Sequence, residues 1–459
     1  MKKQTLAAAI ALAAVSLHAQ ADDVAKSQGF LADSKLALSS RTYYYENDNH
    51  NANAANQQES AEVLKLDYRS GFTQGMIGVG IDAQMIYGLH LDGGRGHHPA
   101  TGNSFWPSDS DGSAVDDFAR GDANVKFRLS KTELHVGGAL FPQLPINTAS
   151  DSRTMPQNFD GGMITSKEID NLTLSAGQLE HSTGRASTNS TALSVSGATK
   201  GSNQFRYAGG DYKVTKDLTV QYYFANLDDF YKQHFLGLVH VLPLGDDQSF
   251  KTDLRYFNSS SDGKNGSDAA GYAFDNNGGY AKHAGEVDNV TWSSMFTYQL
   301  GGSKLLVGYQ SVSDDGGFVS LNQGNVTKDG KPLAKDGSNS EDNGGNGFYL
   351  FTNAVVGSFI RAGENTAFAQ YSYDFTRVGV PGLSAFVNYL RGDDIKDKTL
   401  IGVKHSEWER DAGVDYVIQS GYLKGFGTTL RTGSLHTDGT GVANQDQTRL
   451  IFNYTYNFL

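Results

Sequence analysis

The sequence predicts an all-β protein, a transmembrane antiparallel β-barrel of about 18 strands. Three observations predict this fold. Apolar and polar residues alternate with a period of two in segments spread over the whole chain. The composition is rich in glycine and aromatic residues, with 54 Gly, 25 Phe and 23 Tyr among 459 residues. Beyond the N-terminal segment, no apolar run is long enough for a membrane-spanning helix, so a chain of this kind can cross a membrane only as a barrel.

The first residues have the features of an export signal. Lys2 and Lys3 precede an apolar stretch over residues 6–17, and Ala19-Gln20-Ala21 matches a small-x-small cleavage pattern. A membrane anchor is the alternative, but the stretch is shorter than the ~20 residues that a spanning helix needs. We therefore expect a signal peptide at 1–21 and a barrel domain at 22–459.

Period-two alternation identifies the strands, because successive side chains of a strand point to opposite faces. In residues 76–87, Val79, Ile81, Met85 and Tyr87 share one face, and Asp82 and Gln84 lie on the other. The same arrangement recurs in residues 218–224, 290–298 and 367–375. A strand with one apolar and one polar face is expected between lipid and water.

Polar, glycine-rich stretches separate these strands. They cover residues 47–60, 93–112, 258–285 and 324–347. Their length predicts extracellular loops that alternate with short periplasmic turns, whereas linkers between small domains are the alternative. At roughly 24 residues per strand and connection, the mature chain accommodates about 18 strands, a size at which barrels enclose an aqueous lumen.

The last strand supports a membrane barrel. Leu450, Phe452, Tyr454, Tyr456 and Phe458 alternate with polar residues and Ile451, and the sequence ends at Leu459. Alternating aromatics in a C-terminal strand are typical of the assembly signal of bacterial outer-membrane barrels. A secreted β-sandwich is the structural alternative, but it has no need of such a terminus.

Basic residues alternate with apolar ones in several of these strands, which predicts that they face the lumen. They are Arg41, Lys126, Arg128, Arg206, Arg255, Arg431 and Arg449. A row of fixed cations lowers the desolvation cost of an anion in a narrow pore, and arginine can hold a carboxylate with two hydrogen bonds. In the alternative interpretation, each cation pairs with an inward acid such as Asp82, Asp253 or Asp415 and only neutralises the wall.

Over essentially the whole mature sequence, the chain resembles the OprD family of substrate-specific bacterial outer-membrane porins. The segments that carry the resemblance are Gly29-Phe30, Asp151-Ser152-Arg153, residues 164–170 and 222–228, Arg361-Ala362-Gly363-Glu364, and residues 378–383, 389–393 and 407–411. Together these motifs are far more specific than alternation alone.

The resemblance implies an 18-stranded, mostly monomeric barrel whose inward-folded loops form a narrow constriction, with a ladder of basic side chains leading to it. Members of the family admit small solutes that bear a carboxylate, such as amino acids or aromatic acids, by facilitated diffusion. Arg153 lies in the segment that looks like the constriction loop, where it is either an eyelet cation that grips the carboxylate or part of a salt bridge that pins the loop. Arg41, Arg431 and Arg449 look like ladder positions. Outer-membrane lipid, lipopolysaccharide and the barrel assembly machinery are the expected partners.

Two features depart from the pattern. Thr429 and Asp415 occupy inward positions where further cations are expected in channels for basic amino acids, which argues against that substrate class. Arg391 shares its parity with Val387 and Tyr389, so its orientation is ambiguous.

Other functions are less well supported by the sequence. An outer-membrane phospholipase or protease needs a nucleophile beside a base, and we identify no catalytic residues and expect no enzyme activity. An adhesin is a further alternative because the loops are long. His97-His98 has no further spaced ligands, the chain has no cysteine, and its net charge is −12, so no metal site, no cofactor and no nucleic-acid partner are expected.

Overall fold

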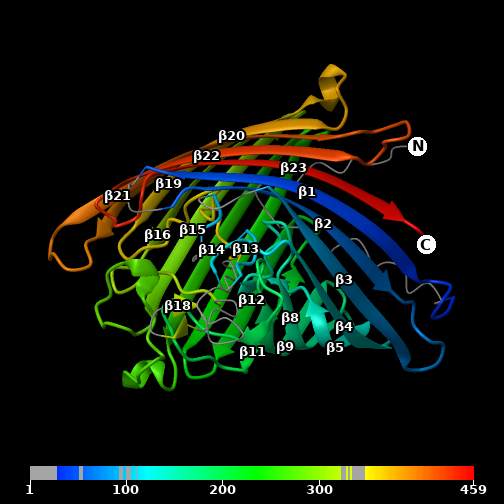
Figure 1. Ribbon diagram of the computed structural model, residues 1–459, viewed down its shortest axis with the longest axis horizontal. Coiled ribbons are helices and arrows are strands. Elements are labelled where there is room, and N and C mark those ends of the chain that lie inside the picture. Colours follow the sequence, from blue (N-terminus) through cyan, green and yellow to red (C-terminus); the bar gives the residue numbers. More distant parts are fainter. Residues whose placement is uncertain are drawn as a thin grey trace.

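Eighteen antiparallel strands form the closed wall of a barrel in a computed structural model of the protein (Figure 1). The structure describes residues 28–50, 55–92, 97–99, 105–109, 111–321, 327–328, 331–332 and 347–459. The first strand, β1 (Lys35–Asn49), pairs with the last, β23 (Gln445–Asn457), and this pairing closes the wall. Closure satisfies the backbone hydrogen bonds of every wall strand, which a lipid environment requires. The predicted fold class is confirmed.

The remaining wall strands follow one another in chain order. They are β2 (Gln57–Arg69), β3 (Gly78–Asp92), β4 (Asp117–Leu129), β5 (Thr132–Leu140), β8 (Asn158–Ser166), β9 (Leu172–Thr183), β11 (Phe205–Lys213), β12 (Leu218–Leu227), β13 (Tyr231–Gly245), β14 (Gln248–Ser261), β15 (Asp288–Leu300), β16 (Ser303–Val312), β19 (Asn365–Asp374), β20 (Leu383–Lys396), β21 (Lys404–Val417) and β22 (Gly427–Asp438).

Several short elements lie outside the wall. They are β6 (Gln143–Leu144), β7 (Asn147–Thr148), β10 (Ser190–Ala192), β17 (Thr327–Lys328), β18 (Lys331–Pro332) and the 3-10 helices η1 (Asn265–Ser267), η2 (Asn276–Gly278) and η3 (Phe375–Val378). Of these, β10 joins the barrel sheet by pairing with the end of β9. Among the residues with a described structure, no helix has the length and apolar character needed to span a membrane.

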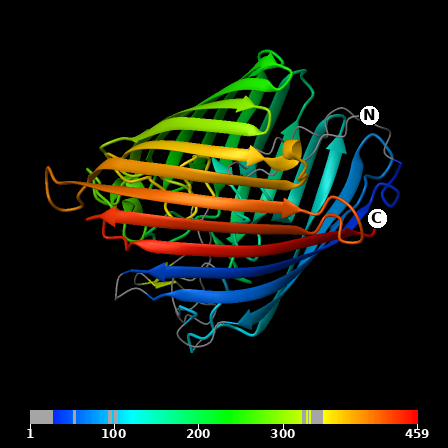
Figure 2. The same ribbon diagram turned by 90° about the horizontal axis from the view of Figure 1, so that it is seen from above.

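Short and long connections lie at opposite ends of the barrel. Two-residue turns at 130–131, 246–247 and 301–302 lie at the end of the barrel where β1 begins and β23 ends (Figure 2). The long connections that follow β3, β5, β14 and β16 start at the other end. In an outer-membrane barrel the short turns are periplasmic and the long loops extracellular.

The outer face of the wall is apolar and aromatic, as the alternation predicts. Tyr87, Tyr222, Trp292, Phe296 and Tyr371 all come from the parities predicted to face lipid, and all are exposed. The residues next to them in sequence, such as Ile86, Tyr223 and Gln370, point inward and are buried. This is the arrangement that lets a strand separate lipid from a lumen.

The hydrophobic core lies inside the barrel, where inward-folded loops pack against the wall. One cluster joins the wall residues Phe205, Tyr223 and Phe257 to the loop residues Ile146 and Leu350. A second joins Tyr43 and Tyr45 of β1 to Phe105, Trp106 and Met155, and a third joins Phe368 and Leu435 to Phe351 and Phe359. The loops therefore narrow the lumen.

Two sequence-based expectations are wrong in detail. Residues 47–60 are not a single loop, because Asn47 pairs with Gln57 and both strands continue to within a few residues of the turn. Arg206 does not face the lumen. Its neighbours Phe205 and Tyr207 are buried in the inner core, so Arg206 points outward, where it is exposed. The aromatic face of β11 packs against inward-folded loops and not against lipid. The inference that the aromatic face of a strand is its outer face is therefore wrong for β11. The predicted signal peptide and most of the predicted loop at 324–347 lie outside the described residues.

Candidate functional site: the constriction of the lumen

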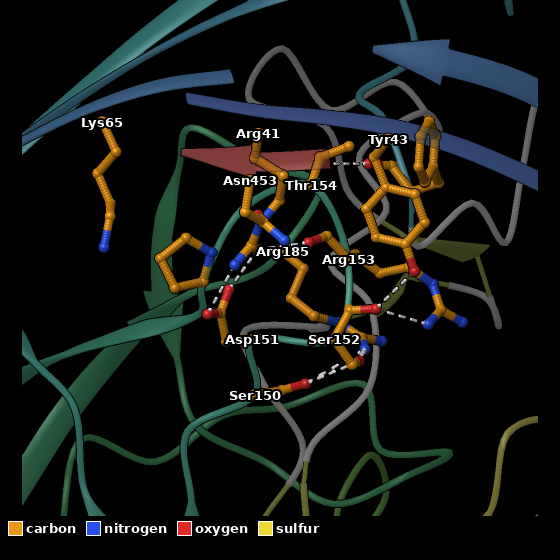
Figure 3. A network of polar contacts seen from close by, with 12 residues as sticks. Arg41, Tyr43, Lys65, Ser150, Asp151, Ser152, Arg153, Thr154, Arg185 and Asn453 are labelled. Carbon is orange, nitrogen blue, oxygen red and sulfur yellow. Dashed lines mark hydrogen bonds and ion pairs between the residues drawn. The ribbon is translucent and has the colours of Figure 1, made fainter. Parts of the chain in front are cut away.

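The loop segment 141–157, which connects β5 to β8, crosses the lumen and is attached to β1 (Figure 3). Arg41 of β1 donates from Nη1 to Asp151 Oδ1 at 2.7 Å and from Nη2 to Oδ2 at 3.1 Å. Arg41 Nη1 also donates to the carbonyl oxygen of Arg153 at 2.8 Å, and Tyr43 Oη donates to the carbonyl of Ser152 at 3.1 Å. The loop is therefore attached to the wall by side chains of β1.

Three guanidinium groups converge beside this attachment. Arg153 comes from the crossing segment, Arg185 from the connection after β9, and Arg449 from the inner face of β23. Burial, followed by the positive charges of Arg153 and Arg449, lowers the pKa of Arg185 to about 9. With this pKa, Arg185 is still charged at neutral pH. The region therefore gathers several guanidinium groups in a small volume.

The hydrogen bonds of these arginines leave donors unused. Arg153 donates to the carbonyl of Ser152 at 3.0 Å and lies over the ring of Tyr45 at 4.9 Å. Arg185 donates to the hydroxyls of Ser150 and Ser152 (Figure 3). Within the described part of the chain, the buried Nε–H groups of Arg153 and Arg185 have no acceptor, and no carboxylate lies within 4 Å of either guanidinium or of that of Arg449.

Arg449 is oriented by a second inward loop segment. Its Nη2 donates to the carbonyl of Val355 and, at 2.8 Å, to Gln447 Oε1. The next two residues of that loop, Val356 and Gly357, donate their backbone N–H groups to Glu409 of β21 at 2.7 and 2.6 Å. Residues 355–357 therefore connect Arg449 of β23 to Glu409 of β21.

Three of the predicted lumenal cations form ion pairs with acids of the inner wall. Lys126 pairs with Asp82 at 2.6 Å, Arg255 with Asp253 at 2.9 Å, and Arg431 with Asp415 at 2.7 Å. These are the partners that the neutralising interpretation names. With Arg41 bound to Asp151, four of the predicted cations are paired.

Arg128 and Arg206 have different surroundings. Arg128, near the periplasmic end of β4, lies over the ring of Phe72 at 4.3 Å. Arg206 lies on the outside of the barrel and donates to the amide oxygens of Gln178 and Gln204. The structure therefore divides the predicted set into Arg153 and Arg449 without an ion pair to a described residue at the constriction, four cations paired with acids, Arg128 stacked on Phe72, and the outward Arg206.

Arg185 and Arg120 are inward arginines that sequence reasoning did not place in the lumen. Arg185 lies in a polar segment without alternation, so parity could not assign it to the lumen. Arg120, on β4, alternates with small residues and not with large apolar ones; it donates to the carbonyls of Gly184 and Ser187 at 2.7 and 3.0 Å. Arg120 lies on the same face of β4 as Lys126, so applying the alternation to the residues before Lys126 would have placed Arg120 inside the barrel.

The structure also assembles a carboxylate, an imidazole and a hydroxyl at the extracellular end. His98 Nδ1 contacts Glu59 and its Nε2 lies 2.8 Å from Ser108 Oγ. All three residues are buried, and Glu59 also contacts His90 Nε2 at 3.2 Å. This network attaches His98 and Ser108 to β2. In the described ranges no group of three or more His, Asp or Glu residues has an arrangement that could hold a metal ion.

Comparison with known proteins gives the same architecture. The family described as outer membrane porin, OprD family, matches residues 28–458. The chain is 30% identical to the porin-like protein GalP of Pseudomonas putida over 95% of both sequences. Among solved structures it is similar to Pseudomonas aeruginosa OccK8 (OprE), with 42% identity, a TM-score of 0.81, and 94% of this chain and 100% of that one covered.

A further solved structure is that of Pseudomonas aeruginosa OpdK with vanillate, at 29% identity and a TM-score of 0.77, which covers 94% of this chain and 100% of the other. These relatives are channels, and together with the barrel they indicate an outer-membrane channel for small solutes. The chain belongs to the OprD family of outer-membrane porins.

Proposed function

We propose that the protein mediates facilitated diffusion of small water-soluble solutes that bear a carboxylate, such as aromatic acids or amino acids. The observation that carries the proposal is the convergence of Arg153, Arg185 and Arg449, for which the described structure offers no carboxylate within 4 Å. An anion that enters the constriction gains charge-assisted hydrogen bonds that no group of the protein already satisfies.

The paired cations give this anion a path on either side. Arg41, Lys126, Arg255 and Arg431 each hold an acid of the protein, and a passing carboxylate can exchange with that acid. Such exchange keeps each contact weak, which transport requires because a tightly held solute does not leave. Arg128 continues the path toward the periplasm, and Arg206 is no part of it. The relative that was crystallised with vanillate, an aromatic carboxylate, supports the solute class.

Single-channel recording in planar bilayers tests the proposal. We expect Arg153→Gln and Arg449→Gln to lower the anion-over-cation permeability ratio severalfold, and to weaken block by millimolar vanillate, since each removes a charge from the constriction. Arg206→Gln is the matched control because it removes the same charge from the outer wall. A permeability ratio that is the same in all four proteins would overturn the proposal.

The buried Glu59–His98–Ser108 chain is a feature of the described residues that would favour an enzyme. We assign it an anchoring role because Ser108 is buried and Glu59 is shared with His90. We further propose that the chain is exported with residues 1–21 removed, is assembled in the bacterial outer membrane by the barrel assembly machinery, and acts as a monomer without a cofactor. The intact mass of the protein purified from outer membranes checks cleavage after Ala21.

A further inference from the structure

The outer faces of β20 and β21 change from apolar to cationic near their extracellular ends. The periplasmic halves carry Leu383, Ala385 and Val387 on β20, and Tyr416, Val414 and Ala412 on β21. The next outward positions are Tyr389 and Arg391 on β20, and Arg410 and Trp408 on β21, which pair directly across the two strands. The two arginines therefore lie where the apolar belt of this wall ends. The three strands β20, β21 and β22 lie side by side in Figure 1.

Aromatic rings form a platform between these cations. Trp408 stacks on His436 of β22 with ring centroids 4.2 Å apart and planes inclined by 7°, and Tyr389 stacks on Trp408 at 6.2 Å. The Arg410 guanidinium lies over the Trp408 ring at 5.6 Å. Tryptophan and tyrosine at this level are typical of the membrane interface, where one end of the ring is apolar and the other is wet.

The charge of this platform is incompletely balanced by the protein. Within the part of the chain that the structure describes, no carboxylate lies within 4 Å of Arg410. Arg391 pairs with Asp393 at 2.9 Å, but both side chains are about half exposed, and an exposed pair of this kind contributes at most about 1 kcal/mol. A more highly charged anion can therefore displace Asp393.

Arg206 provides a comparison, because it is an outward arginine that has hydrogen-bond acceptors within the protein. It is surrounded by the amides of Gln178, Gln204 and Asn226 and donates to two of them. Arg410 has Tyr389, Trp408, Ala412 and Ser434 as neighbours instead. A cation in such apolar surroundings at a lipid boundary is costly unless an anion accompanies it.

We propose that Arg391, Trp408, Arg410 and His436 form a binding site for a phosphate group of a phosphorylated glycolipid of the outer leaflet. Arginine binds phosphate through two parallel N–H donors, and the aromatic platform packs against the sugar and the upper acyl chains. A second copy of this chain does not fit the same site, because a symmetric contact would bring like charges together. The site lies on the outer wall and does not involve the constriction.

Native mass spectrometry of the purified barrel with defined lipids tests this assignment. The probes are diphosphoryl lipid A, the same lipid without phosphates, and phosphatidylglycerol as a general anionic lipid. We expect retention of diphosphoryl lipid A, and about a tenfold loss of apparent affinity in Arg391→Gln/Arg410→Gln, since hydrogen bonds to charged groups contribute about 1.5 kcal/mol or more. Arg206→Gln is the matched outward control and should bind as the parent protein does.

Three results would overturn the assignment: equal retention of the dephosphorylated lipid, equal retention of phosphatidylglycerol, or unchanged binding in the double variant. Unchanged single-channel conductance and an unchanged gel mobility before boiling show that the double variant is folded. A Trp408→Leu variant keeps both charges; loss of binding there assigns a share of the affinity to the platform, and full binding contradicts the role given to Trp408.

Discussion

Arg255 and Arg153 carry the same guanidinium group inside the same barrel, but their surroundings differ. Arg255 holds both oxygens of Asp253, at 2.9 and 3.0 Å, and donates to the carbonyl of Tyr349 at 3.0 Å. Arg153 has a backbone carbonyl and an aromatic ring as neighbours. In the first arrangement the charges of the inner wall neutralise each other, and in the second the guanidinium has no carboxylate of the described residues within 4 Å.

Asp253→Asn tests the structural role of the paired cations. The change leaves Arg255 buried without its carboxylate, and we expect a loss of about 3 to 5 kcal/mol in the free energy of unfolding, because breaking a buried ion pair exposes the full desolvation cost of the remaining charge. Urea unfolding of the barrel in lipid vesicles measures it. The double variant Asp253→Asn/Arg255→Met should regain most of the loss, and an additive double variant would contradict the pairing.

At the scale of elements, strand β21 holds the inward loop segment 347–364 through alternate acidic residues. Glu407 accepts from Arg361 at 2.5 Å, and Glu409 accepts the backbone N–H groups of Val356 and Gly357. Gly433 of β22 permits the approach, because a Cβ there would lie 2.9 Å from the side chain of Val355. The loop that orients Arg449 is thus attached to the wall by Glu409, and each of the two carboxylate oxygens of Glu409 accepts one hydrogen bond.

Glu409→Gln should loosen this attachment, since an amide NH2 group replaces one of the two carboxylate oxygens and cannot accept the N–H group that is bound there. We expect more frequent conductance fluctuations in single-channel recordings and a smaller anion preference, because Arg449 loses its fixed partner at Val355. Glu62→Gln, an outward glutamate of β2, is the control. Recordings of Glu409→Gln that match those of the parent protein would show that residues 355–357 are held by other contacts.

For the whole molecule, the pairing of the first and last strands decides whether the sheet is a barrel. Ser39 lies opposite Thr455 in this pairing, with the two hydroxyl oxygens 2.9 Å apart. The chain has no cysteine, so a cysteine pair introduced at this seam reports on closure alone.

We expect Ser39→Cys/Thr455→Cys to form a disulfide on mild oxidation, because residues directly opposite in an antiparallel pair have Cα atoms about 4.5 to 5.5 Å apart, within reach of a disulfide. The boiled, oxidised protein should then migrate faster on a gel than the reduced protein. Ser39→Cys/Asn457→Cys is the control, since a diagonal pair is about 7 to 8 Å apart. Cross-linking of both pairs to the same extent would argue against the register.

The strand pattern and the identity of the family were accessible from the sequence. Period two is a local property, so the outward faces at 76–87, 290–298 and 367–375 follow from neighbouring residues alone. Arg206 shows the limit of that reasoning. Alternation separates two faces of a strand, but an aromatic face meets lipid in one strand and a loop-filled core in another, and Phe205 and Tyr207 belong to the second kind.

What the sequence by itself determined is the barrel, its strand number and the presence of cations on inward parities, because these depend on residues close together in the chain. Only the tertiary structure decided which cations keep their charge available. Arg41 meets Asp151 of the inward loop, Arg255 meets Asp253 two positions away, and Arg153, Arg185 and Arg449 lie near one another with no carboxylate of the described residues within 4 Å. Charge compensation acts over a few ångströms in space, and the loops that bring these groups together have no periodicity that could reveal their path.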